Sequence, residues 1–112
     1  KKEITGNYHS QLKGVTFQYG SNHSSNVIWL NTILFNNKKQ RDAASNNFRL
    51  EGIDYRLPFS PMSDQPAFLG LDVRGAHGVA DSVHSRGLSV PSSVTLSEKS
   101  QQRVIDAVNK IV

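Results

Sequence analysis

Two arginines stand at the boundaries of predicted elements, where a guanidinium could bind an anion. Arg56 ends a predicted strand and precedes a proline-rich stretch, so its side chain could hold a phosphate or carboxylate through two parallel hydrogen bonds. For the same side chain, a salt bridge to Asp54, Asp64 or Glu51 is equally consistent with the sequence. Arg86 lies in the last turn of a predicted helix, where a cation stabilises the helix dipole. That structural interpretation of Arg86 is favoured over ligand binding.

The other polar side chains do not form a recognisable catalytic or metal site. The chain has no cysteine, which excludes thiol catalysis, disulfides and thiolate metal ligands. No serine stands in a nucleophile elbow, so strand and turn positions account for Ser89, Ser92 and Ser93. Two histidines seven residues apart could share a helix face, but no third ligand accompanies them. We therefore predict no catalytic residue and no metal site, with surface or capping roles for His9, His23, His77 and His84.

The composition describes one domain, residues 1–112, with a net charge of +4 and 37% hydrophobic residues. No apolar run approaches the about 20 residues that a transmembrane helix needs. The start at Lys1-Lys2-Glu3 lacks the apolar core of a signal peptide. The basic residues are scattered over several elements and are not interleaved with aromatic residues, as RNA-binding sheets require. We expect a cytoplasmic protein that binds neither a membrane nor a nucleic acid.

The periodicity of apolar residues predicts an α+β fold, in which helices pack against a small, mostly antiparallel sheet. Gly14 and Gly52 are suited to end helices, and Ser97 is suited to begin one. In chain order the predicted elements are a helix with Ile4, Tyr8 and Leu12 on one face, strands at 15–18 and 27–35, a helix at 39–51, a strand at 53–57, a loop at 58–73, a helix ended by Gly87, a strand at 88–90 and a helix from about Ser97.

The same pattern predicts which side chains are buried. The near-continuous apolarity of 27–35 favours a central strand that is covered on both faces. Trp29 and Phe59 are predicted to lie in the core. The helices are expected to bury stripes that consist of Ala44 and Phe48, of Ala76, Val79, Ala80 and Val83, and of Val104, Ile105, Val108 and Ile111.

Several short motifs, taken in order, resemble the C-terminal end of the DegT/DnrJ/EryC1/StrS family of sugar aminotransferases. Their order and spacing are more specific than any one of them alone. The motifs are Tyr8 with Leu12, the segment 27–34 (VIWLNTIL), Arg41-Asp42, the segment 51–56 (EGIDYR), the segment 57–63 (LPFSPMS), Val79-Ala80-Asp81, the segment 86–93 (RGLSVPSS) and Leu96-Ser97-Glu98.

The resemblance implies the type I aminotransferase fold and an activity on keto-sugars attached to nucleotides, with pyridoxal phosphate (PLP) as the family's cofactor. Ser63 stands where many members have a histidine, which is similar to the GDP-perosamine synthase branch. In a complete enzyme the loops of this domain would face the cofactor cleft. The residues that the resemblance and the sequence together mark for substrate contact are Tyr55, Arg56, Ser63 and Arg86.

The resemblance also implies that the reacting residues lie elsewhere. The family's chemistry needs a Schiff-base lysine and an aspartate on the pyridinium nitrogen, which members carry in a large N-terminal domain. The seven lysines of this chain fall near its ends, on turns or on polar helix faces. We therefore expect an isolated or truncated C-terminal domain that binds no cofactor and is not catalytic by itself. The alternative is a free-standing module that binds a nucleotide-sugar or a protein.

A domain of this kind is expected to expose the apolar surface on which a large domain would pack. Exposed apolar patches favour association. The expected partner is therefore a second copy of the chain, as in a homo-oligomer, or the missing large domain.

Overall fold

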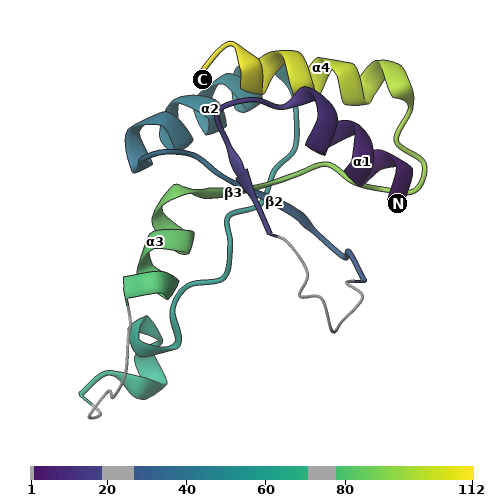
Figure 1. The fold of residues 1–112 in the computed structure, drawn as a ribbon. Coiled ribbons are helices and arrows are strands. Elements are labelled where there is room, and N and C mark those ends of the chain that lie inside the picture. The colour runs from purple at the N-terminus through teal and green to yellow at the C-terminus, as the bar shows by residue number, and fades with distance from the viewer. Residues whose placement is uncertain (1, 19–26, 71–77) are drawn as a thin grey trace.

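A computed structural model describes residues 2–18, 27–70 and 78–112. The predicted surface or capping roles of His23 and His77, and the predicted burial of Ala76, concern positions outside these residues. Within them the chain folds into helices and a three-stranded antiparallel sheet, which confirms the α+β prediction (Figure 1). The helices are α1 (Lys2–Gln11), α2 (Lys38–Glu51), α3 (Gly78–Arg86) and α4 (Glu98–Asn109), and the strands are β1 (Thr16–Phe17), β2 (Asn31–Leu34) and β3 (Gly87–Val90), in sheet order β1-β2-β3.

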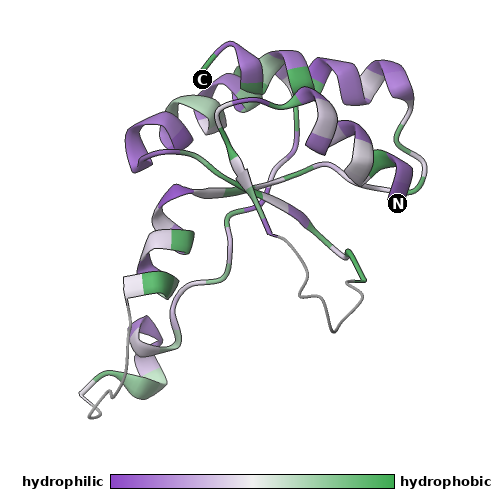
Figure 2. Ribbon diagram, in the orientation of Figure 1, coloured by the Kyte–Doolittle hydropathy of each residue, from purple (hydrophilic) through white to green (hydrophobic). Residues whose placement is uncertain are grey.

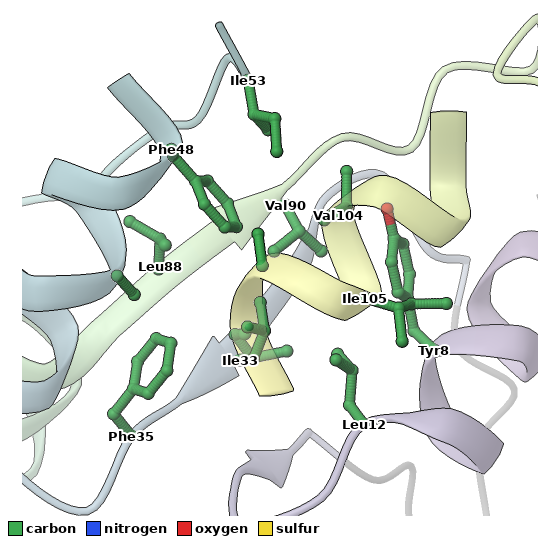
Figure 3. Close-up of a cluster of buried hydrophobic side chains, with 13 residues drawn as sticks. Tyr8, Leu12, Ile33, Phe35, Phe48, Ile53, Leu88, Val90, Val104 and Ile105 are labelled. Carbon is green, nitrogen blue, oxygen red and sulfur yellow. The ribbon is translucent and has the colours of Figure 1, made fainter. Parts of the chain in front are cut away.

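Helices α1, α2 and α4 cover one side of the sheet (Figure 1). Side chains along β2 alternate, so that Asn31 and Ile33 are buried while Thr32 and Leu34 are only partly buried. The core lies between this face and the three helices (Figure 3). Full burial of each large apolar side chain there contributes about 1.5–3 kcal/mol. The fully buried large residues are Tyr8, Ile33, Phe35, Phe48, Leu88, Ile105 and Val108.

The predicted helix ends are confirmed where their chemistry is local. Ser97 caps α4 by accepting a hydrogen bond from the backbone N–H of Ser100 at 3.1 Å. Gly52 follows α2 with a φ of 70°, a left-handed conformation that glycine adopts without steric cost. Gly14 also has a φ of 70°, but α1 already ends at Gln11, so the predicted cap at Gly14 is not confirmed. The caps at Ser97 and Gly52 depend on a few neighbouring residues, so the sequence pattern locates them.

The strand predicted at 27–35 is central, since β2 lies between β1 and β3, but its predicted length is wrong. Only Asn31–Leu34 pairs as β2, and the residues before it precede the sheet. Trp29 is therefore 64% exposed. Phe59, which lies in no helix or strand, is 80% exposed, so the assignment of both residues to the core is wrong. Apolar content alone does not show at which residue strand pairing begins. The start of pairing determines which side chains lie in the sheet and are covered.

Two further predictions hold only in part. The segment 53–57 contributes a single antiparallel bridge between Arg56 and Ser89 instead of a strand, because Pro58 follows and has no N–H to continue a ladder. The helix predicted before Gly87 is present as α3, but none of its side chains is buried. Val79 and Ala80 of its expected stripe are exposed. The last stripe is buried at Val104, Ile105 and Val108 and half-buried at Ile111.

Residues 57–70 and α3 project away from the sheet and the helices that cover it (Figure 1). We call residues 57–70 together with α3 the arm, and the rest of the described chain the body. It contains two short 3₁₀ turns, Met62–Asp64 and Pro66–Phe68. The radius of gyration is 15.2 Å, against about 13 Å for a compact chain of this length. Figure 2 shows hydrophobic residues on the arm away from the body, and those exposed there are Leu57, Phe59, Met62, Phe68, Leu69 and Val79.

Candidate functional site

Two adjoining hollows lie beside β3, and four residues belong to both: Trp29, Leu30, Arg56 and Ser89. One hollow, which we call the polar hollow because Asp54, Arg56 and three serines line it, has a volume of about 410 Å³ and continues along the end of β3. The apolar hollow has a volume of about 370 Å³ and lies between the uncovered sheet face and the arm. The polar hollow is further lined by Asp54, Tyr55, Val90, Pro91, Ser92 and Ser93, and the apolar hollow by Phe17, Gln18, Thr32, Leu34, Leu57, Pro58, Phe59 and Val83.

Arg56 is held by its backbone beside β3. Its N–H donates to the Ser89 carbonyl at 3.2 Å, and the Ser89 N–H donates to the Arg56 carbonyl at 2.8 Å. Its side chain is exposed and makes no hydrogen bond or ion pair within the described residues. Glu51, one of the predicted partners of Arg56, lies near Lys110 Nζ instead, at 3.8 Å. The geometry therefore leaves the guanidinium available to an anion.

Arg86 has protein partners. Its Nη1 donates to the Phe35 carbonyl at 2.9 Å, and its Nε donates to the Ser82 hydroxyl at 2.8 Å. The Phe35 N–H donates in return to the Arg86 carbonyl at 2.9 Å. These bonds join the end of α3 to the end of β2. Arg86 lines neither hollow, so a contact with a ligand stays a prediction for this residue.

The structure brings Tyr55 and Arg56 together and leaves Ser63 apart. Tyr55 is half-buried in the wall of the polar hollow, with its ring packed edge-on against Phe48 at a centroid distance of 6.2 Å. Ser63 lies in the first 3₁₀ turn of the arm and lines neither hollow. Of the predicted contact residues, only Tyr55 and Arg56 therefore share one site.

Trp29 and Ser89 line both hollows, and neither was predicted as a contact residue. Trp29 was assigned to the core, but it lies outside the paired part of β2 and is exposed beside Arg56. The polar Asn31 and Thr32 that interrupt the apolar run were the available signal. Ser89 is buried, and its hydroxyl lies 2.7 Å from the hydroxyl of Thr32 on the neighbouring strand. A serine in the otherwise apolar β3 marks the face that the helices do not cover.

The described residues do not fit PLP. The cofactor needs a lysine whose amine is made reactive by burial or by a cationic neighbour. All six lysines that the structure describes are exposed, and none lines either hollow. Lys38 pairs with Asp42 at 2.7 Å. Among the same residues there is also no group of three histidines, aspartates or glutamates that could hold a metal ion.

The chain is similar to known aminotransferases over nearly its whole length. The model of the DegT/DnrJ/EryC1/StrS aminotransferase family matches residues 1–109. A DegT DnrJ EryC1 StrS aminotransferase from Brucella abortus is 26% identical, with a TM-score of 0.81 over 97% of this chain and 29% of that one. DesV from S. venezuelae, solved in complex with a ketimine intermediate, is 25% identical, with a TM-score of 0.83 over 97% of this chain and 30% of that one.

More distant structures show the same fold. Helicobacter pylori PseC, an aminotransferase involved in the biosynthesis of pseudoaminic acid, is 19% identical, with a TM-score of 0.75 over 98% of this chain and 31% of that one. No curated protein matches the chain. Among the described residues, no helix has the length and apolarity to cross a membrane. The chain spans about 30% of the length of the solved relatives. On the match over residues 1–109, it belongs to the DegT/DnrJ/EryC1/StrS aminotransferase family.

Proposed function

We propose that this chain is the C-terminal small domain of a PLP-dependent nucleotide-sugar aminotransferase-like protein of the cytoplasm, and that it is not catalytic by itself. The observation that carries the proposal is a difference in length. The family model matches residues 1–109, yet the chain spans only 29% of the Brucella abortus relative. The exposure of the described lysines supports it, because a Schiff-base lysine needs burial or a cationic neighbour that makes its amine reactive. Ser63 favours a GDP-perosamine synthase-like branch.

In this proposal the uncovered face of the sheet and the arm form the docking surface for the large domain. The apolar hollow and the exposed Phe59, Met62 and Leu69 lie on the side away from α1, α2 and α4. Each such side chain gains about 1.5–3 kcal/mol when it is fully buried. A second copy of the chain is the other occupant that this surface fits.

The nucleotide sequence upstream of the Lys1 codon tests the domain assignment. We expect an open reading frame that continues upstream and encodes a large domain with the Schiff-base lysine. A start codon and a separate promoter at this position would contradict the assignment and favour a free-standing module.

Labelling with PLP tests the absence of catalysis. The purified chain is incubated with PLP, reduced with borohydride and analysed by peptide mass spectrometry, with the urea-unfolded chain as the control. We expect the folded and unfolded chains to be labelled alike over the described lysines, since all of these are exposed. Stoichiometric labelling of a single lysine in the folded chain alone would refute the proposal.

A second candidate function, a module that binds a nucleotide-sugar, is favoured by the position of Arg56. Its guanidinium lies where the two hollows meet, beside the exposed ring of Trp29. An arginine can bind a diphosphate through paired hydrogen bonds, and an indole can stack on a base. The serine hydroxyls of the polar hollow could then bind the sugar.

Isothermal titration with nucleoside diphosphate sugars tests this second function. We expect binding by the wild-type chain and at least a tenfold loss of affinity in Arg56→Ala, about 1.4 kcal/mol. Arg49→Ala is the matched control, because Arg49 is exposed on α2 and lines neither hollow. Absence of binding, or equal loss in both variants, would exclude the module hypothesis.

A further inference from the structure

A buried arginine of α2 connects the body of the molecule to the base of the arm. The base is the place where the two ends of the arm meet, at Pro58 and His84. Arg41 is only 6% exposed. Its Nη1 donates to the carbonyl of His84 at 3.0 Å and to the carbonyl of Gly87 at 3.3 Å. Its Nε donates to the Asp42 carboxylate at 2.8 Å. One side chain therefore joins α2 to the last turn of α3 and to the first residue of β3.

The partners of Arg41 compensate the burial of its charge, which would otherwise be costly. The His84 carbonyl is one of the last four of α3, which have no partner inside the helix and lie at the negative end of its dipole. The neighbouring carboxylate supplies the opposite charge. Hydrogen bonds from Lys38 and from Arg41 lower the pKa of Asp42, so this carboxylate is ionised at neutral pH.

The two ends of the arm meet at the point that Arg41 holds. The ring Nδ1 of His84 lies 2.9 Å from the carbonyl of Pro58, which joins α3 to the segment that begins the arm. Gly87 lies so close to Pro58 that an added Cβ would be 2.6 Å from its Cγ. A displacement of the α3 end would therefore move Pro58 as well.

The arm forms one wall of the apolar hollow. Pro58, Phe59 and Val83 belong to the arm, and they face Trp29 and the uncovered side of β2 across the hollow. The shape of this hollow is thus set by where the base of the arm is held.

We propose that Arg41 is a positioning residue that holds the arm against the body and so fixes the apolar hollow. It holds the base of the arm from α2, through the carbonyl groups of His84 and Gly87. Arg41 has this role whether or not the hollows bind a nucleotide-sugar or a large domain.

Hydrogen exchange of the whole chain, measured by mass spectrometry, tests the proposal on Arg41→Gln. We expect amides in 58–70 and 78–86 to exchange at least tenfold faster than in the wild type. Amides of α4 should keep their exchange rates within about twofold, because the hydrogen bonds of Arg41 go to Asp42, His84 and Gly87 and not to α4. Arg49→Gln on the same helix is the control and should change neither region.

Quenching of tryptophan fluorescence by acrylamide gives a second readout. Trp29 is the only tryptophan of the chain, and it lies in the hollow opposite Pro58 and Phe59. We expect stronger quenching in Arg41→Gln, and no change in Arg49→Gln. Unchanged exchange in the arm, or an equal increase throughout the chain, would overturn the proposal.

If Arg41→Gln does not fold, Arg41→Lys decides the question. Lysine keeps the charge but lacks the planar fork that reaches several acceptors at once. We expect a folded chain with an intermediate increase of exchange that is confined to the arm. Wild-type exchange in the arm of Arg41→Lys would also refute the proposal.

Discussion

Arg56 and Arg86 have the same functional group, and their surroundings give it different roles. Both were predicted as contact residues from their places at element boundaries. Arg86 is bonded to the Phe35 carbonyl and to the Ser82 hydroxyl, whereas the Arg56 guanidinium has no partner within the described residues. Tyr55 joins Arg56 in the wall of the polar hollow. Two of the four predicted contact residues therefore line one hollow, and ligand binding by them stays a prediction.

Tyr8 is a core residue whose polar end has a definite partner. Its hydroxyl donates to the Pro91 carbonyl at 2.5 Å, across the space between α1 and the end of β3. Tyr8→Phe would leave that carbonyl without its donor, and we expect a loss of about 1–2 kcal/mol in the free energy of unfolding. Urea denaturation at neutral pH measures the loss.

The pH dependence of the same variant provides an independent check. Burial raises the pKa of the Tyr8 phenol above its ordinary value of about 10. The folded pKa is the higher one, so the stabilisation is fully present below pH 10 and is lost as the pH rises above it. We expect the wild type to lose stability above pH 10 more steeply than Tyr8→Phe. Tyr55→Phe is the control, and a cost equal to that of Tyr8→Phe would contradict the assignment.

At the scale of elements, local chemistry located the helix ends, and tertiary contacts decided the strands. The caps at Ser97 and Gly52 are confirmed because each depends on a few neighbouring residues. The segment 27–35 gave a shorter strand than predicted, because pairing with β3 begins only at Asn31. The helix α3 formed where its period indicated, but it lies on the arm with no buried side chain. The spacing of apolar residues predicts whether a segment forms a helix or a strand, but it does not show which other element will cover that segment.

Two glycines provide opposite outcomes for the same substitution. Gly6 lies inside α1 with no atom within 4 Å of an added Cβ. Gly6→Ala should therefore stabilise the chain by about 0.5–1 kcal/mol. At Gly87 an added Cβ would be 2.6 Å from Pro58 Cγ, so Gly87→Ala must displace the base of the arm.

We expect Gly87→Ala to lower the free energy of unfolding by about 1–3 kcal/mol, as overpacked sites do. Chemical denaturation of both variants beside the wild type measures the two shifts. A stabilising Gly87→Ala would show that the arm base has more room than the structure gives it, and a destabilising Gly6→Ala would contradict the open position of Gly6 on α1.

At the scale of the whole molecule, the helices that the structure describes cover the sheet on one side only. Helices α1, α2 and α4 lie on one face of the sheet, and the other face opens into the apolar hollow beside the arm. Exposed apolar residues follow one another along the arm. An isolated chain with such a surface tends to associate with itself.

We expect the isolated chain to form dimers or larger oligomers, and Phe59→Ser to shift them towards monomer. Phe59 is 80% exposed on the arm, so its removal takes apolar area from the contact without opening the core. Light scattering after size exclusion, at several concentrations, measures the mass. Leu50→Ser is the matched control, since Leu50 is 87% exposed on α2 and lines neither hollow.

A monodisperse wild-type monomer at moderate concentration would contradict this expectation of self-association. An equal shift in Leu50→Ser would show that the contact is not made by the arm.

The sequence by itself determined the family resemblance, the α+β class and the caps of α2 and α4, and it predicted Arg56 and Tyr55 as contact residues. These follow from short-range rules, because caps, periods and motif spacing involve residues that are close along the chain. Only the tertiary structure showed that Trp29 and Ser89 share a site with Arg56, and that Arg41 joins α2 to the arm. These residues lie far apart along the chain. They come together because β2 pairs with β3 and because the two ends of the arm meet.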